Sequence, residues 1–173
     1  MTTYISLLRA VNVGGTGKLP MAALKAMCAD AGFTKIETYI ASGNVVFDAE
    51  LSASEVKAAL ETRLQAYAGK PVGVIVRTSR EMAAVLKSNP FPRSAPNRTV
   101  AIFLDDPPPA NALGAARGRM DEELCLGERE IYVAYGGGMG ISKLKIPAAA
   151  KGTARNLNTI KKLVEIATEI EGC

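Results

Sequence analysis

The segment IETYIASGNVVF, residues 36–47, decides the fold because it predicts a β-hairpin in the middle of a longer pattern. Residues 36–40 and 45–47 carry the β-branched and aromatic side chains that favour strands. Between them, residues 41–44 read Ala-Ser-Gly-Asn and supply the glycine and asparagine that suit a hairpin turn. The two strands are therefore expected to pair in an antiparallel sheet.

Helices are predicted on both sides of this hairpin. On its N-terminal side, a buried strand at residues 3–8 precedes a helix at residues 20–32, which begins at a proline and stops at a glycine. On its C-terminal side, the capping box Ser-Ala-Ser-Glu at 52–55 opens a helix that ends at Gly69. A strand at residues 72–76 completes the order β-α-β-β-α-β. This is the split βαβ order of a ferredoxin-like fold, with an antiparallel sheet and two helices on one face.

The remaining residues predict a second subdomain. A capping box at 78–81 opens one further short helix, and the proline-rich segment 89–97 marks a linker. Beyond it the sequence predicts a strand at 99–104, a helix at 110–120, a hairpin with strands at 123–126 and 131–135, a short strand at 141–146, and a last helix over residues 153–170. No strand is predicted after this helix, so the last strand of the β-α-β-β-α-β order is missing from this half. We therefore predict an α+β protein of two ferredoxin-like subdomains, 1–88 and 98–173, whose antiparallel sheets pack together.

Composition excludes several kinds of chemistry. The chain has no histidine, which rules out Ser-His-Asp, Cys-His and histidine–metal mechanisms. The three cysteines, Cys28, Cys125 and Cys173, are too widely spaced for a metal-binding pair, and we expect no chemical role for them. No metal or cofactor is predicted.

Charge and hydropathy indicate a cytoplasmic protein. No apolar run approaches the ~20 residues of a membrane span, and residues 1–5 lack the pattern of a signal peptide. The net charge of +4 is a mild excess for a nucleic-acid binder. With no tryptophan and few other aromatic residues, the chain offers little surface for stacking on single strands.

The segment KGTARNLNT, residues 151–159, is the first candidate site because it opens the predicted last helix. Two interpretations remain open. Its polar side chains could cap the helix and join the two halves through hydrogen bonds. Alternatively, they could bind an anion, which the positive end of the helix dipole favours. The candidate residues here are Thr153, as N-cap, and Arg155, Asn156, Asn158 and Thr159.

Other candidates lie in loops. Residues 12–18, NVGGTGK, follow a strand and precede a helix, so backbone N–H groups there could approach a phosphate. Their spacing matches neither the P-loop nor the dinucleotide-binding pattern. The alternative interpretation is that the segment is a flexible loop with no ligand. Residues 42–44 are a further candidate, and the alternative interpretation is that they only form a tight turn. The loop candidates are Arg9, Asn12, Gly14, Gly15, Lys18, Ser42, Asn44 and Lys143.

Several separate motifs lie far apart in the sequence. They are 8–15 (LRAVNVGG), 19–21 (LPM), 39–47 (YIASGNVVF), 142–144 (SKL) and 152–159 (GTARNLNT). In this order they resemble the bacterial domain-of-unknown-function family 1697, and the match spans almost the whole chain. Ala10 stands where a glycine is common in the family, and Leu157 where tryptophan is frequent. The resemblance implies an α+β protein of two subdomains and implies no activity and no catalytic residue.

Three functions therefore remain open. The first is a non-catalytic module that binds an anionic ligand, a phosphorylated metabolite or nucleic acid, in a cleft between the subdomains. The second is a histidine-independent enzyme acting on a phosphorylated small molecule, with Lys18 or Lys143 as its charged group and glycine-loop N–H groups stabilising negative charge. The third is a structural or interaction protein whose polar motifs only lock the two halves together.

Overall fold

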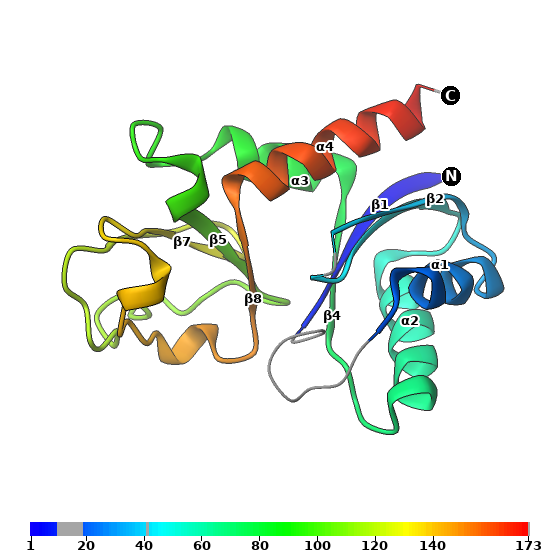
Figure 1. Cartoon of the computed structure of the whole chain (residues 1–173), viewed down its shortest axis with the longest axis horizontal. Helices are drawn as coiled ribbons and strands as arrows, with labels where there is room; N and C mark the ends of the chain where they lie inside the picture. The colour runs from blue at the N-terminus through cyan, green and yellow to red at the C-terminus, as the bar shows by residue number, and fades with distance from the viewer. Residues whose placement is uncertain (10–18, 41, 173) are drawn as a thin grey trace. The chain divides into compact units, whose positions relative to one another are not determined.

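The computed structural model describes residues 1–9, 19–40 and 42–172 (Figure 1). The chain is an α+β protein with two four-stranded antiparallel sheets, which confirms the predicted fold class. None of the helices in the described ranges is long and apolar enough to cross a lipid bilayer.

The chain forms two compact units. The first unit comprises Met1–Met82 and Lys162–Cys173, and the second comprises Ala83–Lys161. Each boundary falls inside a helix, α3 (Ser79–Lys87) or α4 (Leu157–Glu171). The proline-rich segment lies within the second unit.

The first unit has the predicted split βαβ topology. Its strands lie in the order β2-β3-β1-β4, and each neighbouring pair is antiparallel. Two helices, α1 and α2, cover one face of this sheet in Figure 1. The elements are β1 (Thr2–Leu8), α1 (Met21–Asp30), β2 (Thr34–Tyr39), β3 (Asn44–Ala49), α2 (Ala53–Ala68) and β4 (Val74–Thr78).

Local sequence signals set the ends of the helices. Both hydrogen bonds of the capping box that opens α2 are formed. Glu55 N donates to Ser52 Oγ at 3.3 Å, and Ser52 N donates to Glu55 Oε1 at 3.0 Å. Gly69 ends α2 in the left-handed conformation, with φ 74°. Thr78 and Glu81 form the second predicted capping box at the start of α3. These helix boundaries confirm the sequence predictions.

The core of the first unit lies between its sheet and its two helices. Phe33 and Phe47 stack there with ring centroids 4.3 Å apart, and Cys28 is a small buried member of the same cluster. Burying such apolar side chains is the main driving force for folding.

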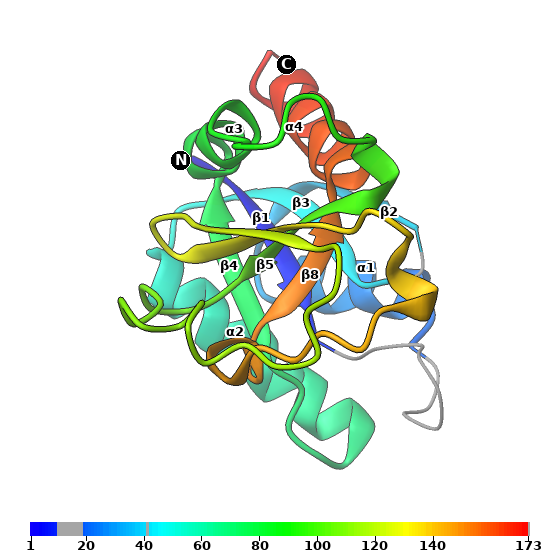
Figure 2. The same cartoon turned by 90° about the vertical axis from the view of Figure 1, so that its left-hand side faces the viewer.

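The second unit repeats the strand order of the first. Its sheet runs β6-β7-β5-β8, again fully antiparallel, and β5 lies beside β8 in Figure 2. In both units a helix follows the last strand directly, α3 after β4 and α4 after β8. The strands are β5 (Thr99–Phe103), β6 (Glu123–Leu126), β7 (Glu130–Ala134) and β8 (Thr153–Asn156).

Three sequence predictions for this unit are wrong. Residues 110–115 form turns and residues 116–120 are irregular, with a φ of 69° at Gly118 that lies outside the α-helical region. Residues 141–146 form no regular strand: the 3₁₀ helix Met139–Ile141 is followed by one isolated β-bridge, between Lys145 and Arg117. The last strand, which the sequence did not predict, is Thr153–Asn156, and it pairs with β5.

Candidate functional site

The end of β1 is the first part of the predicted site that the structure describes. Leu8 N donates to Gly43 O and Arg9 N donates to Gly73 O, each at 2.9 Å. These bonds bring the half-buried Arg9, the β2–β3 turn and Gly73 together at one end of the strands of the first sheet. A side chain at residue 73 would press on the stem of Arg9, 3.0 Å from its Cδ. Four other candidates, Asn12, Gly14, Gly15 and Lys18, lie outside the described residues.

Ser42 and Asn44 shape the turn between β2 and β3. Asn44 is fully buried, and its Nδ2 donates to Tyr39 O and to Ser42 Oγ, both at 2.9 Å. Ile40 and Gly43 both adopt positive φ, 51° and 86°. The Asn44 amide therefore donates two hydrogen bonds within its own turn.

Arg155 lies in a strand and not in the first turn of a helix. Its partner in the sheet is Ala101, and Thr153 pairs with Phe103. The Arg155 side chain is 8% exposed, and its Nη1 donates to Thr153 Oγ1 at 2.6 Å and to Ala154 O at 3.0 Å. Burial lowers the pKa of this guanidinium to about 10, so it remains charged at neutral pH.

The N-cap of the last helix is Asn156, so the prediction that Thr153 caps it is wrong. Asn156 Oδ1 accepts from Thr159 N at 2.9 Å, and α4 begins at Leu157. Thr159 is buried, whereas Asn158 is exposed. The five candidates of this motif are therefore spread over a strand, a cap and two sides of a helix.

A second buried arginine occupies the corresponding position in the first unit. Arg77 immediately precedes the cap residue Thr78 of α3, as Arg155 precedes Asn156. It is 1% exposed, and its Nη1 donates to Val76 O at 3.2 Å, the same preceding-residue contact that Arg155 makes. Sequence reasoning missed Arg77, although its place before a capping box was a usable signal. The two arginines thus make the same contact at the same place in their units.

Lys143 lies on one of two adjacent segments, of which the sequence singled out only residues 142–144. Arg117 and Lys145 exchange two backbone hydrogen bonds of 2.8 Å, which hold residues 117–122 beside residues 141–145. Gly118 packs against the carbonyl of Lys143 so closely that a side chain there would overlap it. We call these two segments the basic ribbon.

Four cations lie on the basic ribbon: Arg117, Arg119, Lys143 and Lys145, all exposed. Along residues 141–146 exposure alternates, so that Lys143 and Lys145 face solvent while Leu144 packs against the core of the unit. Arg119 Nε donates to Glu122 O at 2.8 Å. Within the described part of the chain, the side chains of the other three form no hydrogen bond or ion pair. Their charges are thus available to an external anion.

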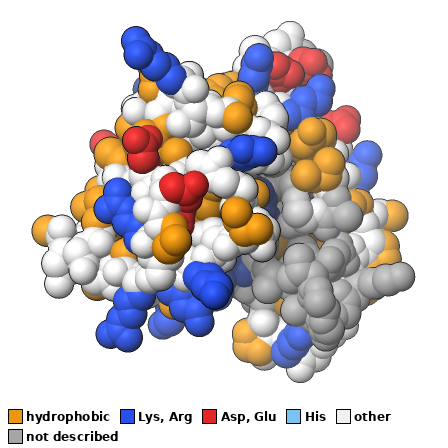
Figure 3. Space-filling view, turned by 60° about the vertical axis from the view of Figure 1, so that its left-hand side comes forward, with side chains coloured by type: hydrophobic (Ala, Val, Ile, Leu, Met, Phe, Trp, Pro, Cys, Tyr) orange, Lys and Arg blue, Asp and Glu red, His pale blue; other side chains and the backbone are white. Residues whose placement is uncertain are grey.

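The charge of the molecule is unevenly divided between its units. In the second unit eleven Lys and Arg residues face seven Asp and Glu residues, whereas the first unit has ten of each. The whole net charge of +4 therefore belongs to the second unit. Figure 3 brings this unit toward the viewer and shows basic side chains along its lower edge.

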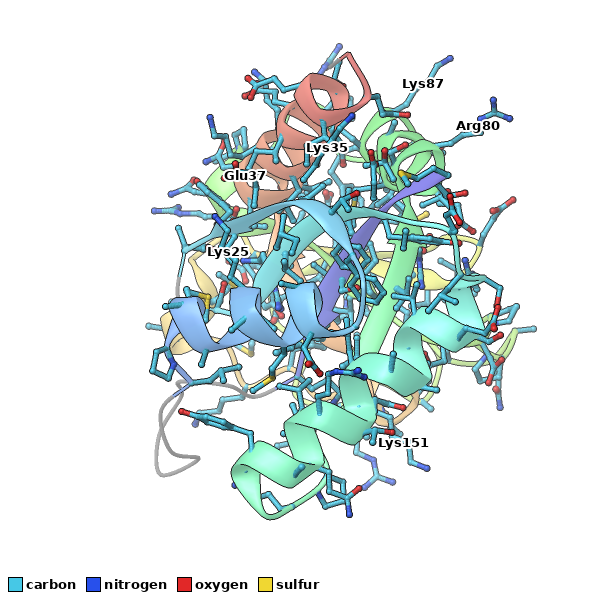
Figure 4. The ribbon with its side chains drawn as sticks, turned by 90° about the vertical axis from the view of Figure 1, so that its right-hand side faces the viewer. Lys25, Lys35, Glu37, Arg80, Lys87 and Lys151 are labelled. Carbon is cyan, nitrogen blue, oxygen red and sulfur yellow. The ribbon has the colours of Figure 1, made fainter. Side chains whose placement is uncertain are left out.

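Two cavities of the described chain are lined by none of the four ribbon cations. One, of about 590 Å³, belongs to the first unit and is lined by Lys35, Asp48 and Arg80 among others. Figure 4 shows Lys35 on β2 and Arg80 at the start of α3. Lys35 Nζ lies 3.6 Å from Asp48 Oδ2, so this cation already has a carboxylate partner. The other cavity, of about 350 Å³, is lined by Arg98, Asp121 and Tyr135 in the second unit.

No metal site is evident in the described part of the chain, where no three Cys, Asp or Glu side chains cluster suitably. The only shifted carboxyl groups there are Glu55 and Glu122, and hydrogen bonds to backbone N–H groups lower the pKa of each. Neither is raised as a general acid would require.

Comparisons with known proteins agree with this description. The chain is similar in structure to the conserved bacterial protein SP0830 from Streptococcus pneumoniae, with a TM-score of 0.79 and 24% sequence identity. The alignment covers 96% of this chain and 98% of that protein, and it shows a shared fold. No curated protein matches the sequence significantly. The family model described as "Protein of unknown function (DUF1697)" matches residues 1–132. The chain therefore belongs to the DUF1697 family.

Proposed function

We propose that this protein is a non-catalytic module that binds nucleic acid through phosphate contacts with the basic ribbon. The observation that carries the proposal is the cluster of four exposed cations on residues 117–122 and 141–145, three of them without a side-chain partner among the described residues. Phosphate contacts of this kind supply most of the affinity of sequence-independent binding.

The shape of the surface favours an extended anion over a small one. Small-molecule sites are concave, whereas none of the four ribbon cations lines either of the two cavities described above. A polyanion needs no pocket, because several phosphates can each contact a separate cation. The ribbon contains no aromatic residue, so we expect little base stacking and little sequence preference.

The observations give less support to a histidine-independent enzyme than to a module that binds nucleic acid. Of its two candidate lysines, Lys18 lies outside the described residues and Lys143 is exposed on the ribbon. The structural alternative has specific support, because Asn44, Thr153, Arg155 and Asn156 all make hydrogen bonds within their own units. We propose that these residues hold the framework while the ribbon binds the ligand.

A salt titration tests the proposal. Binding of a fluorescent oligonucleotide, measured by anisotropy, should weaken with salt at a log–log slope of about −3 to −4 if all four cations contact phosphates. Lys143→Ala should reduce the size of that slope by about 1. Lys70→Ala, at an exposed lysine of the first unit, is the matched control and should leave it unchanged.

Two results would contradict the proposal. One is the absence of salt-dependent binding to both DNA and RNA at low ionic strength. The other is an equal loss of affinity in the Lys143 and Lys70 variants. If a phosphorylated metabolite, and no oligonucleotide, raises the thermal midpoint of the protein, the ligand is a small anion instead.

A further inference from the structure

Large apolar side chains stand beside the cations at one end of the basic ribbon. Met120 is 85% exposed, Ile141 76% and Met139 46%. These are three of the six large hydrophobic side chains that are exposed among the described residues. We call them the apolar tip. Exposing several such side chains together is unfavourable in water and commonly marks a contact surface.

Buried contacts fix the tip in place. Glu122 is only 2% exposed, and its carboxylate accepts from Met120 N at 2.8 Å and from Ser142 Oγ at 3.1 Å. This carboxylate therefore ties the two segments of the ribbon together next to Met120 and Ile141. Gly137 allows a close approach on the other side, because a side chain there would lie 2.9 Å from Ile141 Cδ1.

We propose that the apolar tip inserts between neighbouring base pairs of a duplex held by the basic ribbon, and that it bends the duplex. This inference rests on the proposed function. Isoleucine and methionine are among the side chains that serve as such wedges, and they unstack a base step while cations hold the flanking phosphates. The tip adjoins the four cations along the chain, so one surface supplies both the wedge and the phosphate contacts.

The chemistry of the tip favours a duplex over other anionic partners. Single strands are usually held by stacking on aromatic rings, and the tip has none. An anionic lipid surface would also attract apolar and basic side chains. Interfacial binding to lipid usually uses an amphipathic helix, whereas the regular element at the tip is the three-residue 3₁₀ helix Met139–Ile141, which favours the duplex.

Bending can be measured separately from binding. A short duplex labelled at both ends is titrated with the whole protein, and energy transfer between the labels reports the end-to-end distance. A kink of about 20–90° should raise the transfer at saturation. The double variant Met120→Ser/Ile141→Ser should keep the salt slope of binding and lose the rise in transfer. Ile40→Ser, at an exposed isoleucine of the first unit, is the matched control and should bend the duplex normally.

Each outcome decides the matter. Salt-dependent binding without a change in transfer overturns the wedge and leaves the proposed function intact. Bending that survives the double variant also overturns it. If no duplex binds, the wedge fails, whereas the proposed function fails only if single-stranded DNA and RNA also show no salt-dependent binding. If vesicles containing anionic phosphatidylserine bind the protein in a way that depends on Ile141 while the duplex stays straight, the apolar tip is a lipid-binding surface instead. Circular dichroism of the double variant establishes that it is folded.

Discussion

Cys28 shows how the environment of a single residue controls the stability of this protein. It lies on the buried side of α1, in the core cluster of the first unit. Burial raises the pKa of its thiol from 9.0 to about 12, and the charge of Arg63 opposes part of this shift. The folded state therefore holds the Cys28 proton more tightly than the unfolded state does.

This shift predicts a loss of stability in mild alkali. Between pH 9 and 10 the thiol ionises in the unfolded chain and stays neutral in the folded one, so the free energy of unfolding should fall by about 1.4 kcal/mol per pH unit at most. The contribution is fully present below pH 9. Urea unfolding at several pH values measures it. Cys28→Ala should remove this part of the slope, and an unchanged slope in that variant would contradict the assignment.

Residues with local roles could be predicted from sequence, whereas residues that depend on distant partners could not. Lys143 was found because it lies in a recognisable motif. Arg117 and Lys145 were missed, because only the bridge between two segments 28 positions apart brings them together. Nothing in the residues next to Arg117 indicates that bridge.

The same distinction applies to secondary-structure elements. Helix α2 carries its own signals, a capping box and a terminal glycine, and its predicted ends agree with the structure. The segment 153–156 has the composition of a helix start, but pairing with residues 100–103 makes it a strand. Its hydrogen-bond partners are about 50 positions away, and a local pattern contains no information about them.

The true start of α4 can be tested by substitution. Asn156→Ala removes the side-chain acceptor of Thr159 N and should lower the free energy of unfolding by about 1 kcal/mol. Asn158→Ala changes an exposed residue of the same type two positions later and should stay within about 0.5 kcal/mol of the wild type. Denaturant titrations of both variants compare the two effects. A larger loss in the Asn158 variant would show that the helix is capped elsewhere.

For the whole molecule, the distribution of charge between the two units is more informative about anion binding than the net charge. A net charge of +4 over 173 residues is a mild excess, weaker than the clustered basic surface expected of a dedicated nucleic-acid binder. The structure divides the chain into a neutral unit and a basic one. This division could not be read from the sequence, because the last turns of α4 group with the first unit.

Charge reversal separates the effect of the ribbon from the effect of net charge. Lys143→Glu/Lys145→Glu and Lys25→Glu/Lys70→Glu both lower the net charge from +4 to 0, and all four lysines are exposed. If binding depends on local phosphate contacts, the first pair should abolish it, because two attractive contacts become repulsive. The second pair should weaken it only modestly, through the long-range field that salt screens. Anisotropy titrations at matched ionic strength compare the two variants. Equal losses would mean that any surface lysine of the protein serves as well as the ribbon, and the ribbon would then have no special role.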